Sequence, residues 1–183
     1  LKQYIDEWAF KPTGAQLRVI GAIVADMAAP APMARLVQGD VGCGKTAVAF
    51  AAIFAAARAG WQAALMAPTE VLARQHYENA INELEPRGIH CALLTGSVTG
   101  ARRREVLAGL ADGSIQLAIG THALISDGVE YAKLGLVVTD EQHRFGVRQR
   151  TKLSEKGQSP NTLVMSATPI PRTLALVIYG DLD

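Results

Sequence analysis

The sequence predicts an α/β fold in which a parallel sheet carries helices on both faces, giving a three-layer α/β/α arrangement. Short apolar segments of strand length alternate with longer segments of helical periodicity, and polar motifs follow the apolar segments. Strands are expected at residues 34–38, 63–67, 90–94, 115–119, 136–139 and 162–165. Helices are expected at residues 15–27, 45–59, 70–83, 99–110, 148–156 and 172–179.

Residues at the joints support these boundaries in chain order. The first helix should end at the proline-containing segment 28–32, because the residue before a proline disfavours helix. Gly60 follows the second helix as a C-cap would, and Thr99 precedes a later helix as an N-cap would. Ligands of open α/β sheets gather beyond the carboxyl ends of the strands, so we expect the functional residues directly after each strand.

Length and composition favour one domain with a sizeable core. The chain has 183 residues, of which 49% are hydrophobic and 19% charged, and this excludes a disordered protein. A formal net charge of +1 excludes a strongly basic, histone-like protein but allows a local basic face. The two cysteines, Cys43 and Cys91, are too few for a secreted disulfide framework, so we expect a reducing compartment, the cytoplasm.

No segment predicts a signal peptide or a membrane span. Residues 1–10 mix charged and apolar side chains, and the apolar run 47–57 is shorter than the roughly 20 residues that cross a bilayer. We therefore expect no membrane partner. The chain begins with Leu1 and ends at Asp183 without a closing signal, so we expect a piece of a larger protein.

The segment between the first strand and the second helix fits the phosphate-binding pattern G-x-x-x-x-G-K-[ST]. Its residues are Gly39, Asp40, Val41, Gly42, Cys43, Gly44, Lys45 and Thr46. Glycines let backbone N–H groups surround a phosphate, and the following helix presents unpaired N–H donors. Lys45 would reach the β- and γ-phosphates of a nucleotide, and the Thr46 hydroxyl would bind Mg²⁺. We expect no catalytic role for Cys43.

An acidic pair, Asp140 and Glu141, follows the apolar run 136–139. Such a pair is the usual partner of a phosphate loop: Asp140 would hold Mg²⁺, and Glu141 would orient and deprotonate an attacking water. In isolation, two carboxylates after a strand would more often be a solvated loop or a helix cap.

Residues 140–147 read D-E-Q-H-R-F-G-V and residues 166–173 read S-A-T-P-I-P-R-T. With the phosphate loop, these strings resemble motifs I, II and III of superfamily 2 helicases and translocases. The longer strings resemble the RecG-type fork-remodelling helicases of bacteria and their relative, the transcription-repair coupling factor. Gln142, where the coupling factor typically has Glu, favours the RecG type, and so do residues 36–41 and 67–70.

The resemblance implies a single N-terminal RecA-like P-loop NTPase domain over residues 1–183, with adenine recognition and a lead-in helix in residues 1–30. It implies ATP and Mg²⁺ as cofactors, and double-stranded and branched DNA, such as replication forks and Holliday junctions, as partners. A second RecA-like domain and a wedge domain would be supplied from outside this chain, so the isolated piece should hydrolyse little ATP. ATP hydrolysis would drive DNA translocation in repair and recombination.

Further roles come from the resemblance position by position. Phe10, Thr13 and Gln16 would recognise adenine, although Thr13 and Gln16 also fit an ordinary helix start. The DNA-facing residues would be Pro68, Thr69, Thr95, Gly96, Thr121 and His122. Threonine hydroxyls and backbone N–H groups grip phosphates without reading bases. The alternative for Thr69, Thr95 and Thr121 is simple capping.

The resemblance implies that motif III couples the nucleotide state to DNA binding through Ser166, Thr168 and Arg172. His143 would relay between the ATP site and motif III. The alternatives are a plain strand-to-helix turn and, for His143, packing alone. We expect Cys91 in the core, and His76, His90 and His122 as surface or motif residues because they lack metal-ligand spacing with the cysteines.

Two other functions stay open at this point. The first is the motor of a transcription-repair coupling factor, whose partner would be RNA polymerase. The second is an ATP-gated interaction module that does not hydrolyse ATP, against which the intact Glu141 argues. A phosphate-loop kinase fits less well, since the string at 166–168 has no place in it.

Overall fold

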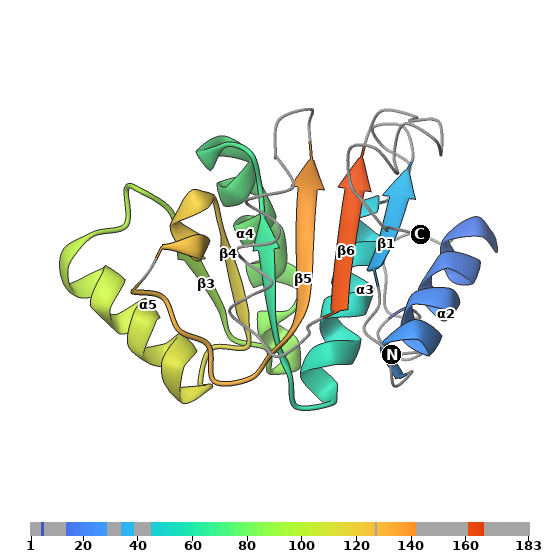
Figure 1. The fold of residues 1–183 in the computed structure, drawn as a ribbon, viewed down its shortest axis with the longest axis horizontal. Coiled ribbons are helices and arrows are strands. Elements are labelled where there is room, and N and C mark those ends of the chain that lie inside the picture. The colour runs from blue at the N-terminus through green and yellow to red at the C-terminus, as the bar shows by residue number, and fades with distance from the viewer. Residues whose placement is uncertain are drawn as a thin grey trace.

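A six-stranded parallel sheet forms the centre of the chain in the computed structural model (Figure 1). The structure describes residue 5 and residues 14–28, 34–38, 45–126, 128–141 and 161–166. The strand order is β1-β6-β5-β2-β4-β3. The strands are β1 (Ala34–Gln38), β2 (Gln62–Met66), β3 (Cys91–Leu94), β4 (Leu117–Gly120), β5 (Leu134–Glu141) and β6 (Asn161–Ser166).

Helices cover both faces of the sheet. They are α2 (Gly14–Ala28), α3 (Lys45–Arg58), α4 (Glu70–Glu83) and α5 (Gly100–Asp112), with short 3₁₀ turns η1 (Glu85–Arg87) and η2 (His122–Ile125). One core cluster joins α2, α3 and α4 to the sheet, and a second joins α5 and η2 to its other face. In Figure 1, α5 lies in front of the sheet and α3 and α4 lie behind it. The predicted three-layer α/β/α fold is confirmed.

Strand β2 shows why the apolar runs are continuous. Its five residues are all buried. Ala63 and Leu65 belong to the core on the α3 and α4 side, whereas Ala64 and Met66 belong to the core on the α5 side. Because successive side chains of a strand point to opposite faces, a strand covered on both faces is apolar except where a polar side chain is hydrogen-bonded, as Gln62 is at the start of β2.

The predicted strands are all present, but β5 is longer than expected. It extends from Leu134 to Glu141 because its ladder with β6 continues, pairing Asp140 with Met165 and Glu141 with Ser166. The acidic pair therefore forms the last two residues of the strand, and the strand end expected at residue 139 is wrong. The helices expected at 148–156 and 172–179 lie outside the described residues.

The joints agree with the sequence where they are described. Gly60 has a φ of 89°, which glycine adopts without strain, where the chain turns from α3 into β2. Thr99 is the N-cap of α5 but makes no side-chain capping hydrogen bond. Cys91 is buried, as predicted. Within the part of the chain that the structure describes, no helix is both long and apolar enough to cross a bilayer.

Candidate functional site

The predicted site residues gather at one edge of the sheet. All the strand pairs are parallel, so the carboxyl ends of the strands share that edge. The segments that begin or end there are Gln38, Ala67–Thr69, Thr95–Ser97, Thr121, Asp140–Glu141 and Ser166. The fold thus brings together residues from six separate parts of the chain.

Strand register places the three nucleotide motifs side by side. Gln38, the last residue before the phosphate loop, pairs with Ser166 of β6, and Ser166 pairs with Glu141 of β5. Lys45 is the first residue of α3, so residues 39–44 connect strand β1 to a helix in the sequence. This is the context that a phosphate loop requires, because the backbone N–H groups at the start of a helix are unpaired and face an anion.

Asp140 faces the side of the sheet that α3 and α4 cover. Leu136 and Val138 belong to the core cluster on that side, and Asp140 follows them at the same two-residue spacing. The carboxylate is half-buried, and its Oδ2 lies 2.8 Å from Nε2 of His76 on α4. Within the described part of the chain, the other oxygen of this carboxylate makes no hydrogen bond.

His76 is the partner that the sequence did not reveal. We expected a surface or motif residue, and the first of these is wrong, because only 6% of His76 is exposed. Its Nδ1 is buried and has no hydrogen-bond partner among the described residues. A signal was present: His76 lies on the inward stripe of α4 with Ala73 and Ala80, at helical spacing.

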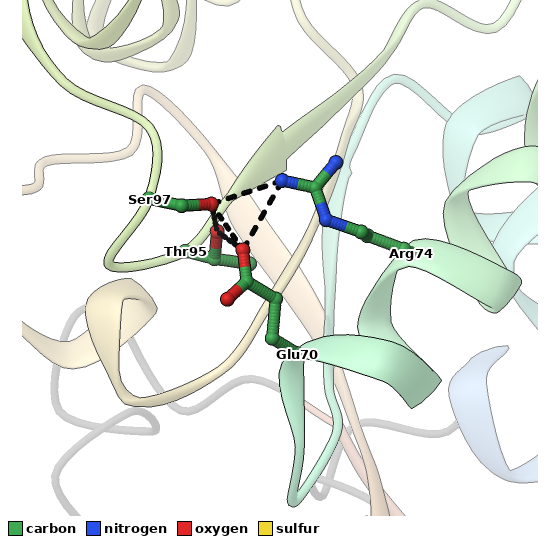
Figure 2. A network of polar contacts seen from close by, with 4 residues as sticks. All are labelled: Glu70, Arg74, Thr95 and Ser97. Carbon is green, nitrogen blue, oxygen red and sulfur yellow. Dashed lines mark hydrogen bonds and ion pairs between the residues drawn. The ribbon is translucent and has the colours of Figure 1, made fainter.

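A second polar cluster ties α4 to the loop after β3 (Figure 2). The Glu70 carboxylate accepts hydrogen bonds from Thr95 Oγ1 at 3.0 Å, from Arg74 Nη2 at 3.1 Å and from the Ser97 hydroxyl. Arg74 also donates to Ser97 Oγ at 2.9 Å. Hydrogen bonds from Ser97, Thr95 and Arg74 lower the pKa of the Glu70 carboxyl below its usual value. The cluster holds the starts of two predicted DNA-facing segments together.

The residues predicted to face DNA differ in their exposure to solvent. Thr69 is exposed and caps α4, accepting a hydrogen bond from the Leu72 N–H at 3.2 Å. Thr95 is fully buried and its hydroxyl is engaged with Glu70, whereas Gly96 is exposed. Thr69 thus caps the helix, and its predicted contact with DNA stays a prediction. For the loop after β3, the exposed groups are the backbone and side chains that follow Thr95.

The other residues predicted to face DNA follow β2 and β4. Pro68 and Thr121 are half-buried, His122 is exposed, and Thr121 begins η2 without a side-chain capping bond. Gly120 ends β4 where the backbones are closest: a Cβ added there would lie 1.9 Å from the Leu94 carbonyl oxygen. Only glycine fits at this point, which explains why it precedes Thr121.

Several predicted site residues lie outside the described residues. They are Phe10, Thr13, Gly39, Asp40, Val41, Gly42, Cys43, Gly44, His143, Thr168 and Arg172. The structure places the backbone of four more: Gln16 in the first turn of α2, Lys45 at the start of α3, Glu141 at the end of β5 and Ser166 at the end of β6. The roles predicted for all of these residues stay predictions.

The described residues fit a magnesium–nucleotide complex better than a metal held by protein alone. No group of three or more His, Cys, Asp and Glu side chains within the described residues could hold a metal ion. Mg²⁺ is typically held by one or two protein oxygens together with substrate phosphates and waters. Asp140 offers one carboxylate oxygen, and Thr46 offers a hydroxyl in the first turn of α3. This donor set suits Mg²⁺ with a bound nucleotide.

Comparison with known proteins assigns the family. The family model of the DEAD/DEAH box helicases matches residues 13–177. The chain belongs to the DEAD/DEAH box helicase family. This membership agrees with the superfamily 2 motifs predicted at 39–46, 140–143 and 166–168.

Within the DEAD/DEAH box helicases, the chain is similar to RecG proteins, as the strings at 140–147 and 166–173 predict. It is 55% identical over 183 residues to the ATP-dependent DNA helicase RecG of Bacillus subtilis (strain 168), covering all of this chain and 27% of that protein. It is 58% identical over 174 residues to RecG of Streptococcus pneumoniae serotype 4 (strain TIGR4), covering 95% of this chain and 26% of that protein. The chain spans about a quarter of the length of these curated relatives.

A solved structure agrees with these sequence matches. A structure of RecG bound to a three-way DNA junction matches 99% of this chain and 24% of its own chain, with a TM-score of 0.87 and 48% identity. At this identity the similarity covers both fold and sequence, and the prediction of a RecG-type RecA-like domain is confirmed.

Proposed function

We propose that this chain is the first RecA-like motor domain of a RecG-type DNA helicase. In the whole protein, hydrolysis of Mg–ATP would drive translocation on double-stranded DNA and the remodelling of stalled forks and branched DNA in repair and recombination, in the cytoplasm. One observation carries the proposal: strand register sets the phosphate-loop strand, Ser166 and Glu141 side by side, with Asp140 next to them. RecG similarity over the full chain supports it independently.

The nucleotide would bind across the carboxyl ends of β1 and β5. The N–H groups of residues 39–44 and the start of α3 would surround the phosphates, and Lys45 would bind the β- and γ-phosphates. Phe10, Thr13 and Gln16 would recognise the adenine. Thr46 and Asp140 would hold Mg²⁺, which supplies positive charge that offsets the charge on the phosphate oxygens.

Glu141 would orient the attacking water and accept its proton. It directly follows Asp140 at the end of β5, and in these roles Glu141 would act on the water while Asp140 holds the metal. Ser166 lies beside Glu141 on the neighbouring strand, as a residue that couples hydrolysis to DNA would need to. His143, Thr168 and Arg172 would complete this relay.

The DNA would run along the same edge beyond β2, β3 and β4. Pro68, Thr69, Gly96, Thr121 and His122 would face its phosphates there, and the buried Thr95 would hold the loop that carries Gly96 through its bond to Glu70. Such contacts are independent of base sequence, as a translocating motor requires. Replication forks and Holliday junctions are the proposed substrates. The second RecA-like domain and the wedge domain would complete the enzyme, so this chain alone should hydrolyse little ATP.

A pair of variants in the natural full-length protein tests this function. Glu141→Gln should lower DNA-stimulated ATP hydrolysis by about 10²- to 10⁴-fold with nucleotide affinity retained, since only the general base is lost. Lys45→Ala should remove most of the nucleotide affinity itself, measured by calorimetry. Glu130→Gln, at an exposed acid outside the predicted motifs, is the matched control. Equal nucleotide binding by Lys45→Ala and the wild type would refute the proposal.

The same assay decides the alternative of an ATP-gated interaction module. Such a module would bind nucleotide but show no hydrolysis stimulated by DNA. Glu141→Gln would then have no effect on turnover. DNA-stimulated hydrolysis that depends on Glu141 would exclude it.

A further inference from the structure

We propose that His76 is a positioning residue for Asp140: it holds one carboxylate oxygen by a hydrogen bond and thereby leaves the other oriented to bind Mg²⁺. This inference rests on the proposed function, in which Asp140 is a magnesium ligand. It adds a residue of α4 to a site otherwise built from β5 and the start of α3.

The contact between the two side chains is direct and shielded from water. His76 Nε2 lies 2.8 Å from Asp140 Oδ2, across 64 residues of sequence. The side chains are 8% and 17% exposed, respectively. Because an ionised carboxylate can only accept, Nε2 carries the hydrogen and donates it. A hydrogen bond to a charged acceptor in a partly dehydrated place is strong enough to fix a side-chain orientation.

Packing alone does not explain a histidine at this position. Ala73 and Ala80, the neighbours of His76 on the inward stripe of α4, are apolar and fully buried. The ring also leaves Nδ1 buried without a partner among the described residues, which costs free energy that a leucine would not lose. The bond to Asp140 is the contact that compensates for this cost. In metal sites, a residue that does not touch the metal commonly fixes the orientation of a metal ligand by a hydrogen bond of this kind.

Helix α4 carries two polar residues of the site: His76, which contacts Asp140, and Glu70, which contacts the loop after β3. Glu70, in the first turn of the same helix, is bonded to Thr95 and to Ser97 in the loop after β3. Six residues separate Glu70 from His76, about 9 Å along the helix axis. One rigid helix therefore contacts both the proposed DNA-facing loops and the proposed magnesium ligand.

Magnesium-dependent nucleotide binding tests the proposal without relying on catalysis. We would titrate Mg²⁺ into the full-length protein with a fluorescent ADP analogue and compare the wild type with His76→Leu and His76→Gln. His76→Leu removes the donor, and it should raise the Mg²⁺ concentration for half-maximal effect about tenfold or more. Its affinity for the analogue in EDTA should not change. His76→Gln can donate from a similar position and should recover most of the loss.

Ile81→Ala is the matched control, because Ile81 also packs from α4 against the core but lies away from Asp140 in the helix. It should lower the thermal midpoint without shifting the Mg²⁺ dependence. His76→Leu with a wild-type Mg²⁺ dependence, or a shift equal to that of Ile81→Ala, would overturn the positioning role while leaving the proposed function intact. If the affinity of the wild-type protein for the ADP analogue does not depend on Mg²⁺, the proposed function is overturned, and this inference with it.

Discussion

The two edges of the sheet use polar side chains in different ways. At the amino edge, the buried Gln62 bonds only to backbone groups: Nε2 donates to the carbonyls of Leu110 at 3.0 Å and Ile115 at 2.8 Å. Its Oε1 accepts from the Lys133 N–H at 2.7 Å. Both donor hydrogens and the acceptor are used, and three segments are joined. The polar groups of this side chain are therefore all bonded within the protein.

At the carboxyl edge, polar side chains bond mainly to one another, and some buried polar atoms have no hydrogen-bond partner within the described residues. Glu70 binds Thr95, and His76 binds Asp140. The buried side-chain polar atoms without partners in the described part of the chain are His76 Nδ1 and Thr139 Oγ1, both at this edge. Unsatisfied buried groups in a native fold call for an explanation. They lie at the edge where the proposed ligands would bind, whereas the side-chain amide of Gln62 at the other edge is fully bonded within the fold.

The largest difference between the two edges is expected in the alkylation of the two cysteines and its effect on nucleotide binding. Cys91 begins β3 at the amino edge, and burial together with the nearby Glu85 carboxylate raises the pKa of its thiol to about 12. At about pH 8 its thiolate fraction is then about a thousandfold below that of an ordinary cysteine. Iodoacetamide should therefore leave Cys91 unmodified in the folded protein, as measured by peptide mass spectrometry, and modify it after denaturation.

Cys43, in the predicted phosphate loop, should behave in the opposite way. Bulky alkylation there should block nucleotide binding, because the loop must close around the phosphates. A Cys91→Ala variant restricts labelling to Cys43 and is the control. Unchanged nucleotide affinity after confirmed labelling of Cys43 would contradict the assignment of this edge to the nucleotide.

The next largest effect is expected from Asp140→Asn. The amide keeps the volume of the side chain but loses the charge that binds the metal, so ATP hydrolysis should fall by at least about a hundredfold. The free energy of unfolding should change little by comparison, since Asp140 contributes one hydrogen bond to the described fold. Parallel measurement of hydrolysis and of urea denaturation checks this. A variant that hydrolyses ATP normally would remove the functional distinction between the edges.

Gln62→Leu should give the reverse pattern. It removes the partner of the Lys133 N–H and of the Ile115 carbonyl, whereas the Leu110 carbonyl keeps the Ala132 N–H, and we expect a loss of about 2 kcal/mol in the free energy of unfolding. Nucleotide affinity of the folded protein should stay at its wild-type value. Gln75→Leu, at an exposed position of α4, is the control and should change stability little. A Gln62 variant with full stability but weaker nucleotide binding would contradict the structural role of the amino edge.

The fold could be predicted largely because its signals are local. The bounds of β1 and α4 agree with the sequence-based expectation, since an apolar run fixes the first and the capping residue Thr69 fixes the start of the second. The end of β5 could not be predicted in the same way. Asp140 and Glu141 are polar, and they are in a strand only because β6 continues to pair with them.

The site could be predicted as a set of motifs but not as a set of contacts. The phosphate loop and the acidic pair are recognisable because their chemistry requires fixed residue types at fixed spacing. The bonds from His76 to Asp140, from Thr95 to Glu70 and from Gln62 to Lys133 join residues 64, 25 and 71 positions apart. Such pairings depend on which strands become neighbours in the sheet, and no local pattern encodes them.

The smallest effect is expected from Thr95→Val compared with Thr95→Ser. Valine has the shape of threonine but lacks the hydroxyl that bonds to Glu70, so we expect it to cost about 1 kcal/mol of stability at neutral pH. Serine keeps the hydroxyl and should retain the bond. DNA affinity should fall more in Thr95→Val than in Thr95→Ser if the hydroxyl acts by fixing the loop through Glu70.

The pH dependence of stability identifies the bond responsible. The pKa of Glu70 is lowered in the folded protein, so its hydrogen bonds contribute fully above the ordinary glutamate value of 4.5 and are lost as pH falls through the lowered pKa. The stability difference between Thr95→Val and Thr95→Ser should therefore be constant near neutral pH and shrink in strongly acidic solution. A difference that does not change with pH would show that Thr95 acts through its buried packing and not through the carboxylate, and the carboxyl edge would then lack one of the bonds that distinguish it from the amino edge.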